Sequence, residues 1–255
     1  MSASAVAIEG EVHDIYGNKV PHEIPRAMTV PEIRSTVEDY VKASRLASEA
    51  GFDGVEVHAA NGYLLDQFLQ SPSNQRTDEY GGDMENRFRF LKEVVEGLLA
   101  DGAYPANRVG VRLSPNGSYG DMGGEDNHVL FPFVAERLNH YGLSYLHVMD
   151  GLGFGFHAKS DVVTVSDIRK VFDGPIIGNI GLTRDTAEGM IRSGATDLAA
   201  FGRPFISNPD LVERYQNDWP LNEDAPMSVY YSPSGATGYT DFPFYEPAAE
   251  EEDEL

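Results

Sequence analysis

An imidazole, a carboxamide and a phenol lie within six residues of one another, at His58, Asn61 and Tyr63. They follow directly on residues 53–58, where apolar and polar side chains alternate as they do in a β-strand. The first two groups could donate hydrogen bonds to a carbonyl oxygen while the phenol delivers a proton. The alternative is that three polar residues only cap the loop after the strand. The spacing alone leaves both interpretations open.

Arg112 ends a second segment of strand-like sequence, residues 108–113. A buried guanidinium needs an anion or a carbonyl partner, because it stays charged at any physiological pH. A cofactor carbonyl could be that partner, and so could one of the 41 acidic side chains of this chain. Arg112 is therefore a candidate cofactor-binding residue with an equally simple alternative, an internal ion pair.

Two later predicted strands end in Gly178 and Asn179, and in Gly202 and Arg203. Glycine lets backbone N–H groups approach phosphate oxygens, a helix N-terminus favours an anion, and an arginine adds a charged fork. In parallel barrels, these last two strand ends are the usual place for a phosphate. The alternative is that the glycines only form tight turns.

Strand-like and helix-like segments alternate along most of the chain, which predicts parallel strands joined by right-handed helical crossovers. The strands are expected at residues 53–58, 108–113, 144–149, 175–179 and 196–201, and the helices at residues 32–50, 85–100, 129–141, 164–171, 184–193 and 208–215. Ligands of such folds bind at the carboxyl ends of the strands, where all the candidate residues lie.

A complete parallel barrel needs eight strands, and the sequence predicts five. The fold class is therefore α/β, a TIM-type barrel in partial form. We expect a hairpin or loop segment at residues 1–30, the partial barrel at residues 31–245 and a solvated acidic tail at residues 246–255. Five strands would leave two open edges and an unclosed apolar interior, a state expected to bind partners or aggregate.

The composition excludes several classes of function. The formal charge of −22 would repel both nucleic acids and anionic membranes, and no apolar stretch is long enough for a membrane span. The absence of cysteine excludes disulfides, thiolate zinc sites and iron–sulfur clusters. Asp83, Glu85 and His147 lack the spacing of metal ligands, so no metal site is predicted. We expect a cytoplasmic protein, and the scarcity of lysine beside many acidic residues favours a salt-loving source.

Several longer segments resemble the old yellow enzyme family of FMN-dependent ene-reductases, which includes 12-oxophytodienoate reductases. The matching segments are residues 51–69, 73–82, 85–87, 109–115, 178–179, 201–211 and 238–243. The resemblance covers residues 21–247 and implies a barrel that holds FMN at its carboxyl-end mouth. It also implies that NADH or NADPH reduces the flavin and that an activated alkene, such as an enone or a nitroalkene, reoxidises it.

The same resemblance assigns roles to the residues at the first two strand ends. It implies that His58 and Asn61 bind the carbonyl or nitro oxygen of the substrate. Hydride then moves from the flavin to the β-carbon, and Tyr63 protonates the α-carbon. Arg112 corresponds to the arginine that faces the pyrimidine edge of the flavin.

Toward the C-terminus, the resemblance implies that Gly178, Asn179, Gly202 and Arg203 bind the FMN phosphate. It places Tyr230 on the substrate side of the site.

The family's first three strand–helix units have no counterpart in this sequence. Three interpretations follow: a separate chain completes the barrel, the chain self-associates through its open edges, or it is a truncated product. The alternative to an enzyme is accordingly a non-catalytic or partner-dependent barrel fragment.

Overall fold

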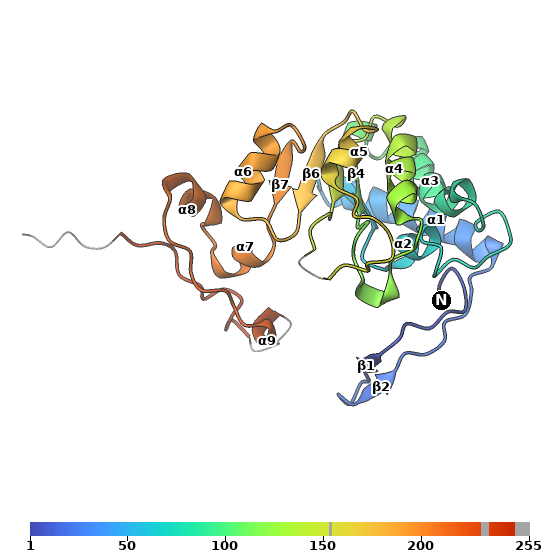
Figure 1. Cartoon of the computed structure of the whole chain (residues 1–255), viewed down its shortest axis with the longest axis horizontal. Helices are drawn as coiled ribbons and strands as arrows, with labels where there is room; N and C mark the ends of the chain where they lie inside the picture. Colours follow the sequence, from blue (N-terminus) through green and yellow to red (C-terminus); the bar gives the residue numbers. More distant parts are fainter. Residues whose placement is uncertain (153–154, 231–234, 248–255) are drawn as a thin grey trace, which may run out of the picture. The chain divides into compact units, whose positions relative to one another are not determined.

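The structure, a computed structural model, describes residues 1–152, 155–230 and 235–247 (Figure 1). The chain divides into two compact units, Met1–Ala199 and Ala200–Leu255, which are described separately below. Most of the predicted acidic tail, residues 246–255, lies outside the described residues. The predicted domain boundaries at residues 30 and 245 stay predictions.

Five strands form one sheet in the order of the chain, which confirms the predicted α/β fold of a partial barrel. The strands are β3 (Val55–Ala59), β4 (Val109–Leu113), β5 (Tyr145–Val148), β6 (Ile176–Asn179) and β7 (Leu198–Ala200). The pairs β3–β4, β4–β5 and β5–β6 are parallel. Since neighbours in sequence are neighbours in the sheet, the carboxyl ends of successive strands lie along one edge.

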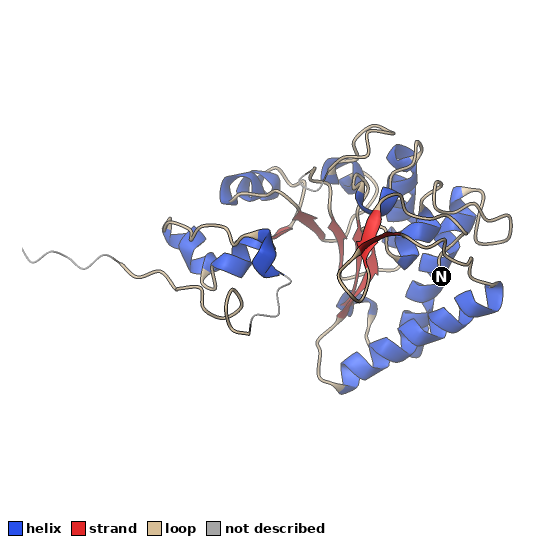
Figure 2. Cartoon of the chain, turned by 90° about the horizontal axis from the view of Figure 1, so that it is seen from below, coloured by secondary structure: helices blue, strands red, loops and turns tan. Residues whose placement is uncertain are grey.

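The crossover helices occur where helical periodicity predicted them (Figure 2). They are α1 (Val30–Glu49), α3 (Met84–Asp101), α4 (Asn127–Asn139), α5 (Val165–Arg169) and α6 (Arg184–Arg192). Local sequence fixes their ends. Thr29 and Glu32 form a capping box at the start of α1, and Asp83 caps α3. Gly102 ends α3 in the left-handed conformation, with φ of 74°.

The apolar core lies between the sheet and these helices. Side chains alternate along each strand, so that Val57, Val111 and Leu146 face the helices and are almost completely buried. They pack with helical residues such as Val94 and Val134. This burial of both a strand face and several helix faces is the main stabilising contribution to the first unit.

The opposite face of the sheet corrects the expectation of an apolar interior. On β3–β6 it carries Glu56, His58, Arg112, His147 and Asn179, all of which are less buried than their neighbours on the helical face. The strand alternation places one polar residue after another on this side. The inner face therefore offers hydrogen-bonding groups instead of an apolar surface that would favour non-specific aggregation.

The remaining elements of the first unit are short. They are β1 (Glu11–His13), β2 (Lys19–Pro21), α2 (Leu64–Leu69) and the 3₁₀ helices η1 (Ala106–Arg108) and η2 (Tyr119–Asp121). Strands β1 and β2 form an antiparallel hairpin within residues 1–30 (Figure 1). Among the described residues, no helix combines the length and apolarity that a membrane crossing requires.

The second unit contains α7 (Arg203–Ser207), α8 (Leu211–Asn217) and α9 (Met227–Tyr230). Its centre is Arg214, a buried residue whose Nε donates to Asp210 Oδ1 at 2.6 Å. The same guanidinium donates to the carbonyl oxygens of Pro220 and Pro243. One charged side chain thus ties α8 to two later segments of the second unit.

Candidate active site

His58 and Arg112 are direct register partners on β3 and β4, and His147 is the partner of Arg112 on β5. All three side chains therefore lie on the inner face, near the carboxyl ends of their strands. The structure thus brings together two of the residues that the sequence singled out, and adds His147, for which the sequence predicted no metal-binding role.

Arg112 reaches over β5 to β6, where its Nη2 donates to Asn179 Oδ1 at 3.0 Å. Its Nε is buried and has no hydrogen-bond partner among the described residues. Burial lowers the pKa of Arg112, and the nearby Glu56 carboxylate opposes that shift. The guanidinium remains charged, since its pKa starts above 12. Of the two interpretations of Arg112, the internal ion pair is not what the structure shows, since no carboxylate of the described residues lies within ion-pair distance of it.

Below Arg112, Glu56 on β3 accepts a hydrogen bond from His147 Nδ1, with 3.0 Å between Nδ1 and Oε2. Tyr145 lies across Gly110 of β4, where a Cβ would come within 2.3 Å of the Tyr145 ring. Burial and the Glu56 carboxylate raise the pKa of Tyr145 to about 12. No role was predicted from the sequence for Glu56, Tyr145 and His147. Their alternation with buried residues along the strands, like that of His58 and Arg112, was a usable signal.

His58 is an uncharged hydrogen-bond donor at neutral pH. Burial, followed by the positive charge of Arg112, lowers its pKa, and Glu56 only partly opposes the shift. Its ring centroid lies 5.4 Å from that of Tyr63, whose own ring lies 6.5 Å from Tyr119. Tyr119, in the loop after β4, is a neighbour of the site that the sequence did not indicate.

The turn between His58 and Tyr63 gives these side chains their directions. Asn61 and Gly62 both have positive φ, 58° and 72°, and Tyr63 N–H donates to the carbonyl of Ala60 at 3.2 Å. This is the pattern of a tight turn for which Asn-Gly is the preferred pair. Neither the imidazole of His58 nor the carboxamide of Asn61 forms a hydrogen bond with another of the described residues. Both donors are thus available to a ligand.

Packing on the helical face of the sheet leaves no room for a side chain at residue 178. A Cβ there would lie 2.9 Å from Met190 and 3.0 Å from Thr196, on the side away from Arg112. Asn179, the next residue, points to the inner face and contacts Arg112. Phosphate binding by Gly178 therefore stays a prediction that concerns its backbone alone.

The other three predicted site residues belong to the second unit. Gly202 is the N-cap of α7 and Arg203 is its first residue, so a short helix begins here, ahead of the one expected at residues 208–215. Tyr230 ends α9. Their roles in binding remain predictions.

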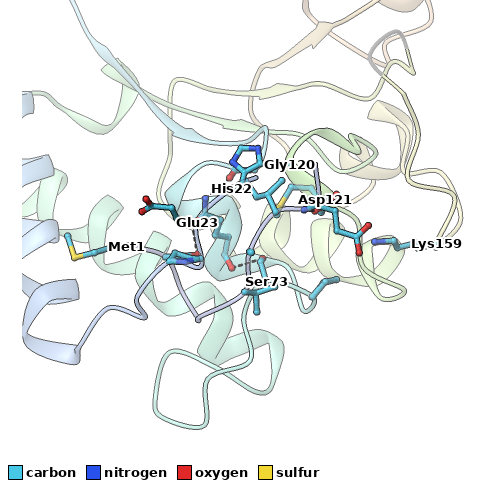
Figure 3. Close-up of a pocket in the computed structure, with 17 residues that line it drawn as sticks. Met1, His22, Glu23, Ser73, Gly120, Asp121 and Lys159 are labelled. Carbon is cyan, nitrogen blue, oxygen red and sulfur yellow. Dashed lines mark hydrogen bonds between the residues drawn. The ribbon is translucent and has the colours of Figure 1, made fainter. Parts of the chain in front are cut away.

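A cavity of about 440 Å³ borders the turn after His58 at Gly62 (Figure 3). Its lining includes Gly62 of that turn, Asp121 of the loop after β4, and His22 and Glu23 that follow β2. Figure 3 shows Asp121 and Lys159 toward one end of the view and Met1 toward the other. The N-terminal segment thus forms part of the walls next to the candidate site.

These features define an α/β barrel protein with a polar site at the carboxyl ends of its parallel strands. The sequence matches the NADH:flavin oxidoreductase / NADH oxidase family over residues 2–222. The chain belongs to that family.

Individual relatives agree with this assignment. The chain is 40% identical over 229 residues to 12-oxophytodienoate reductase 2 of Arabidopsis thaliana, covering 88% of this chain and 60% of the relative. It is 41% identical over 250 residues to a probable flavin mononucleotide-dependent alkene reductase of Leishmania infantum, covering 96% and 66%. The chain spans about three fifths of the length of the plant relatives that it matches.

Solved structures show the same fold. An old yellow enzyme homologue from Zymomonas mobilis superposes with a TM-score of 0.87 at 39% identity, over 96% of this chain and 68% of that one. Morphinone reductase in complex with tetrahydroNAD gives a TM-score of 0.84 at 36% identity, over 96% and 66%. These two likenesses confirm the predicted barrel class and the family resemblance.

Proposed function

We propose that the protein is an FMN-dependent oxidoreductase that reduces activated C=C bonds with hydride from NADH or NADPH. The observation that carries the proposal is the inner face at the strand ends. There, two uncommitted donors, His58 and Asn61, lie beside a phenol and next to a buried guanidinium. The family membership and the relatives named above support the same conclusion.

The residues present fit one edge of a flavin. The buried Nε of Arg112 has no protein partner in the described structure, and an unsatisfied buried donor is costly unless a ligand accepts from it. Arg112 is already oriented by Asn179. We therefore assign Arg112 to the pyrimidine edge of FMN, with Gly178, Asn179, Gly202 and Arg203 at its phosphate.

The redox chemistry would come from bound FMN, through which hydride passes from the nicotinamide to the alkene. The chain's own residues act on the alkene. His58, neutral at pH 7, and Asn61 donate to the carbonyl or nitro oxygen and stabilise the negative charge that develops there. Tyr63 donates its phenolic proton to the α-carbon, where a phenol of pKa about 10 is an adequate acid for a carbanion. We place Tyr230 on the substrate side.

We further propose that activity requires the strands that lie beyond β3 in a complete barrel, whether on this polypeptide, on a complementing chain or on a second copy. Strand β3 is at one edge of the five-stranded sheet, so its outer backbone groups are available for pairing. The polar inner face supports the same view, because closure would surround Glu56, Arg112 and His147 with further partners. A chain that works without those strands would contradict this part of the proposal.

The test is a coupled assay on the purified chain, loaded with FMN under anaerobic conditions. Oxidation of NADH or NADPH is followed after addition of a cyclic enone, and the organic product is identified by mass spectrometry. With a fragment that supplies the strands beyond β3, we expect oxidation that depends on both FMN and enone, with the saturated ketone as product, and little or no oxidation without that fragment. Oxidation without a saturated product, or none with a complementing strand fragment present, would contradict the proposed activity.

A further inference from the structure

The turn that carries Asn61 is held from below by two side chains. Ser114, the first residue after β4, accepts a hydrogen bond from Asn61 N–H at 2.7 Å. Asp66, in α2, accepts from Gly62 N–H at 2.9 Å through Oδ2. The backbone N–H groups of both left-handed residues are therefore satisfied by side chains instead of by neighbouring backbone.

Asp66 also joins the two supports. Its Oδ2 accepts from Ser114 Oγ at 3.4 Å, and its Oδ1 accepts from Gln70 Nε2 at 2.8 Å. Both Asp66 and Gln70 are completely buried. Three donors, from Gly62, Gln70 and Ser114, thus converge on one carboxylate, and among the described residues no lysine or arginine is paired with it. An acceptor-only group fits this arrangement, whereas an amide would turn its own N–H₂ toward one of the donors.

The network continues into the loop after β4. Gln70 Oε1 accepts from Gly123 N–H at 2.6 Å and from Asn127 Nδ2 at 3.2 Å. Asn127 in turn donates to the carbonyl of Pro115 at 3.0 Å. The carboxylate of Asp66 is therefore the point at which the loops after β3 and β4 are tied together. Such fully connected buried networks make one backbone geometry rigid.

Keeping a carboxylate here has a cost. Burial raises the pKa of Asp66 to about 6, although all three hydrogen bonds oppose the shift. A buried group without a charge partner is retained at such a cost mainly where its hydrogen bonds are needed. Two of those bonds adjoin the candidate site: Ser114 Oγ also accepts from Asn61 N–H, and Gly62 directly precedes Tyr63.

We infer that Asp66 is a positioning residue for substrate binding: through Ser114 and Gly62 N–H, it fixes the turn that directs Asn61 and Tyr63 toward the alkene. This inference deepens the proposed function and rests on it. Asp66 does not touch the substrate. Its contribution is that the two site residues need not be ordered when the substrate binds.

The experiment compares wild type with Asp66→Asn, Ser114→Ala and the control Val94→Ala on the full chain. Val94 is a completely buried core residue of α3 and takes no part in the hydrogen-bond network under the turn, so its truncation destabilises the fold without removing one of those bonds. The first readout is amide hydrogen exchange by NMR at the backbone N–H groups of Asn61 and Gly62. We expect these two amides to lose protection at least tenfold in Asp66→Asn and Ser114→Ala. In Val94→Ala, their loss of protection should differ by less than twofold from the loss at the core amides of the same variant. Equal protection in Asp66→Asn and wild type would overturn the inference.

The second readout is kcat/KM for an enone with the FMN-loaded chain. We expect at least a tenfold loss in Asp66→Asn, a smaller loss in Ser114→Ala, and unchanged affinity for FMN in both. Normal alkene reduction by Asp66→Asn would overturn the inference while leaving the proposed function intact. If wild type is inactive even with a fragment that supplies the strands beyond β3, the proposed function fails, and the exchange at Asn61 and Gly62 alone decides whether Asp66 fixes the turn.

Discussion

Arg112 Nη2 donates to Asn179 Oδ1 over a distance of 3.0 Å, across the strand β5 that separates their two strands. Among the described residues, this is the one hydrogen bond of the Arg112 guanidinium, whose Nε is buried and has no partner there. Two strand ends are thereby joined on the inner face of the sheet. The bond leaves Arg112 oriented and with donor capacity for a further acceptor.

Arg112→Ala should weaken FMN binding by at least tenfold, because the variant loses a charged donor at the flavin edge, a contribution of about 1.5–3 kcal/mol. Asn179→Ala should weaken binding less, and the double variant should lose less than the sum of the two, since the residues share a bond. Quenching of FMN fluorescence measures the affinities. Arg34→Ala, an exposed arginine of α1 paired with Glu79, is the matched control and should bind FMN as wild type does.

His58→Ala and Asn61→Ala should each lower kcat/KM for an enone by about 10²–10³, the range found when one oxyanion donor is removed. Their FMN affinity should remain within twofold of wild type, because neither is assigned to the flavin. Steady-state kinetics with FMN titrations separate the two effects. Equal losses of FMN binding and activity would instead mean that these residues hold the cofactor.

Tyr63→Phe should slow protonation of the product and leave hydride transfer unchanged. General acids contribute about 10²–10⁴. Because 53% of the Tyr63 surface is exposed, water can replace part of its function, and we expect a loss at the lower end, about 10²-fold. Deuterium incorporation from D₂O at the α-carbon and stopped-flow flavin reoxidation measure the two steps. An unchanged turnover number would remove Tyr63 from the mechanism.

Asp66 should make folding stability depend on pH. Its pKa is raised to about 6 from 3.8, so the folded state holds a proton that the unfolded state has released between these values. Stability from this group is fully present below about pH 4 and is lost as pH rises through about 6, on the order of 3 kcal/mol in total. Urea unfolding of wild type and Asp66→Asn at pH 4.5 and 8 tests this. The difference in unfolding free energy between wild type and Asp66→Asn should change with pH, whereas the exposed control Asp39→Asn should show the same pH dependence as wild type.

Gly110→Ala should destabilise the protein by about 1–3 kcal/mol, the usual cost of overpacking a well-packed site. The added Cβ would lie 2.3 Å from the ring of Tyr145, which must move and lose its contact with Glu56. Urea unfolding at pH 7 measures the loss. A matched Gly→Ala change at Gly189 in α6, where nothing lies within 4 Å of an added Cβ, should be neutral or stabilising.

The regular elements could be predicted because their signals are local. Helical periodicity placed α1 and α3 within about two residues of their observed ends, where the structure shows caps at Thr29 and Gly102. The short helix α2 (Leu64–Leu69) was missed, because six residues after a polar turn give too little periodicity to separate helix from loop. Helix α7 (Arg203–Ser207) was missed for the same reason, and because Pro204 at its second position also reads as a turn.

The candidate site was predicted in its strand-end residues and not in their support. His58 and Arg112 were found because polar residues at strand ends are visible in the sequence, and their register confirms that they are neighbours. Asp66 looks like an ordinary helical polar residue, and only the fold reveals that it lies under Gly62. The interior was wrongly expected to be apolar, since the sequence alone does not say which side of each strand the helices cover.

The most direct test of the central claim is an absorbance spectrum of the chain purified in high salt, after FMN is added and free FMN is dialysed away. The account predicts retained flavin bands that NADH or NADPH bleaches anaerobically and that a cyclic enone restores. The Arg112→Ala variant should retain much less flavin under the same dialysis. A wild-type chain that keeps no flavin, alone and with a fragment supplying the strands beyond β3, would contradict the account.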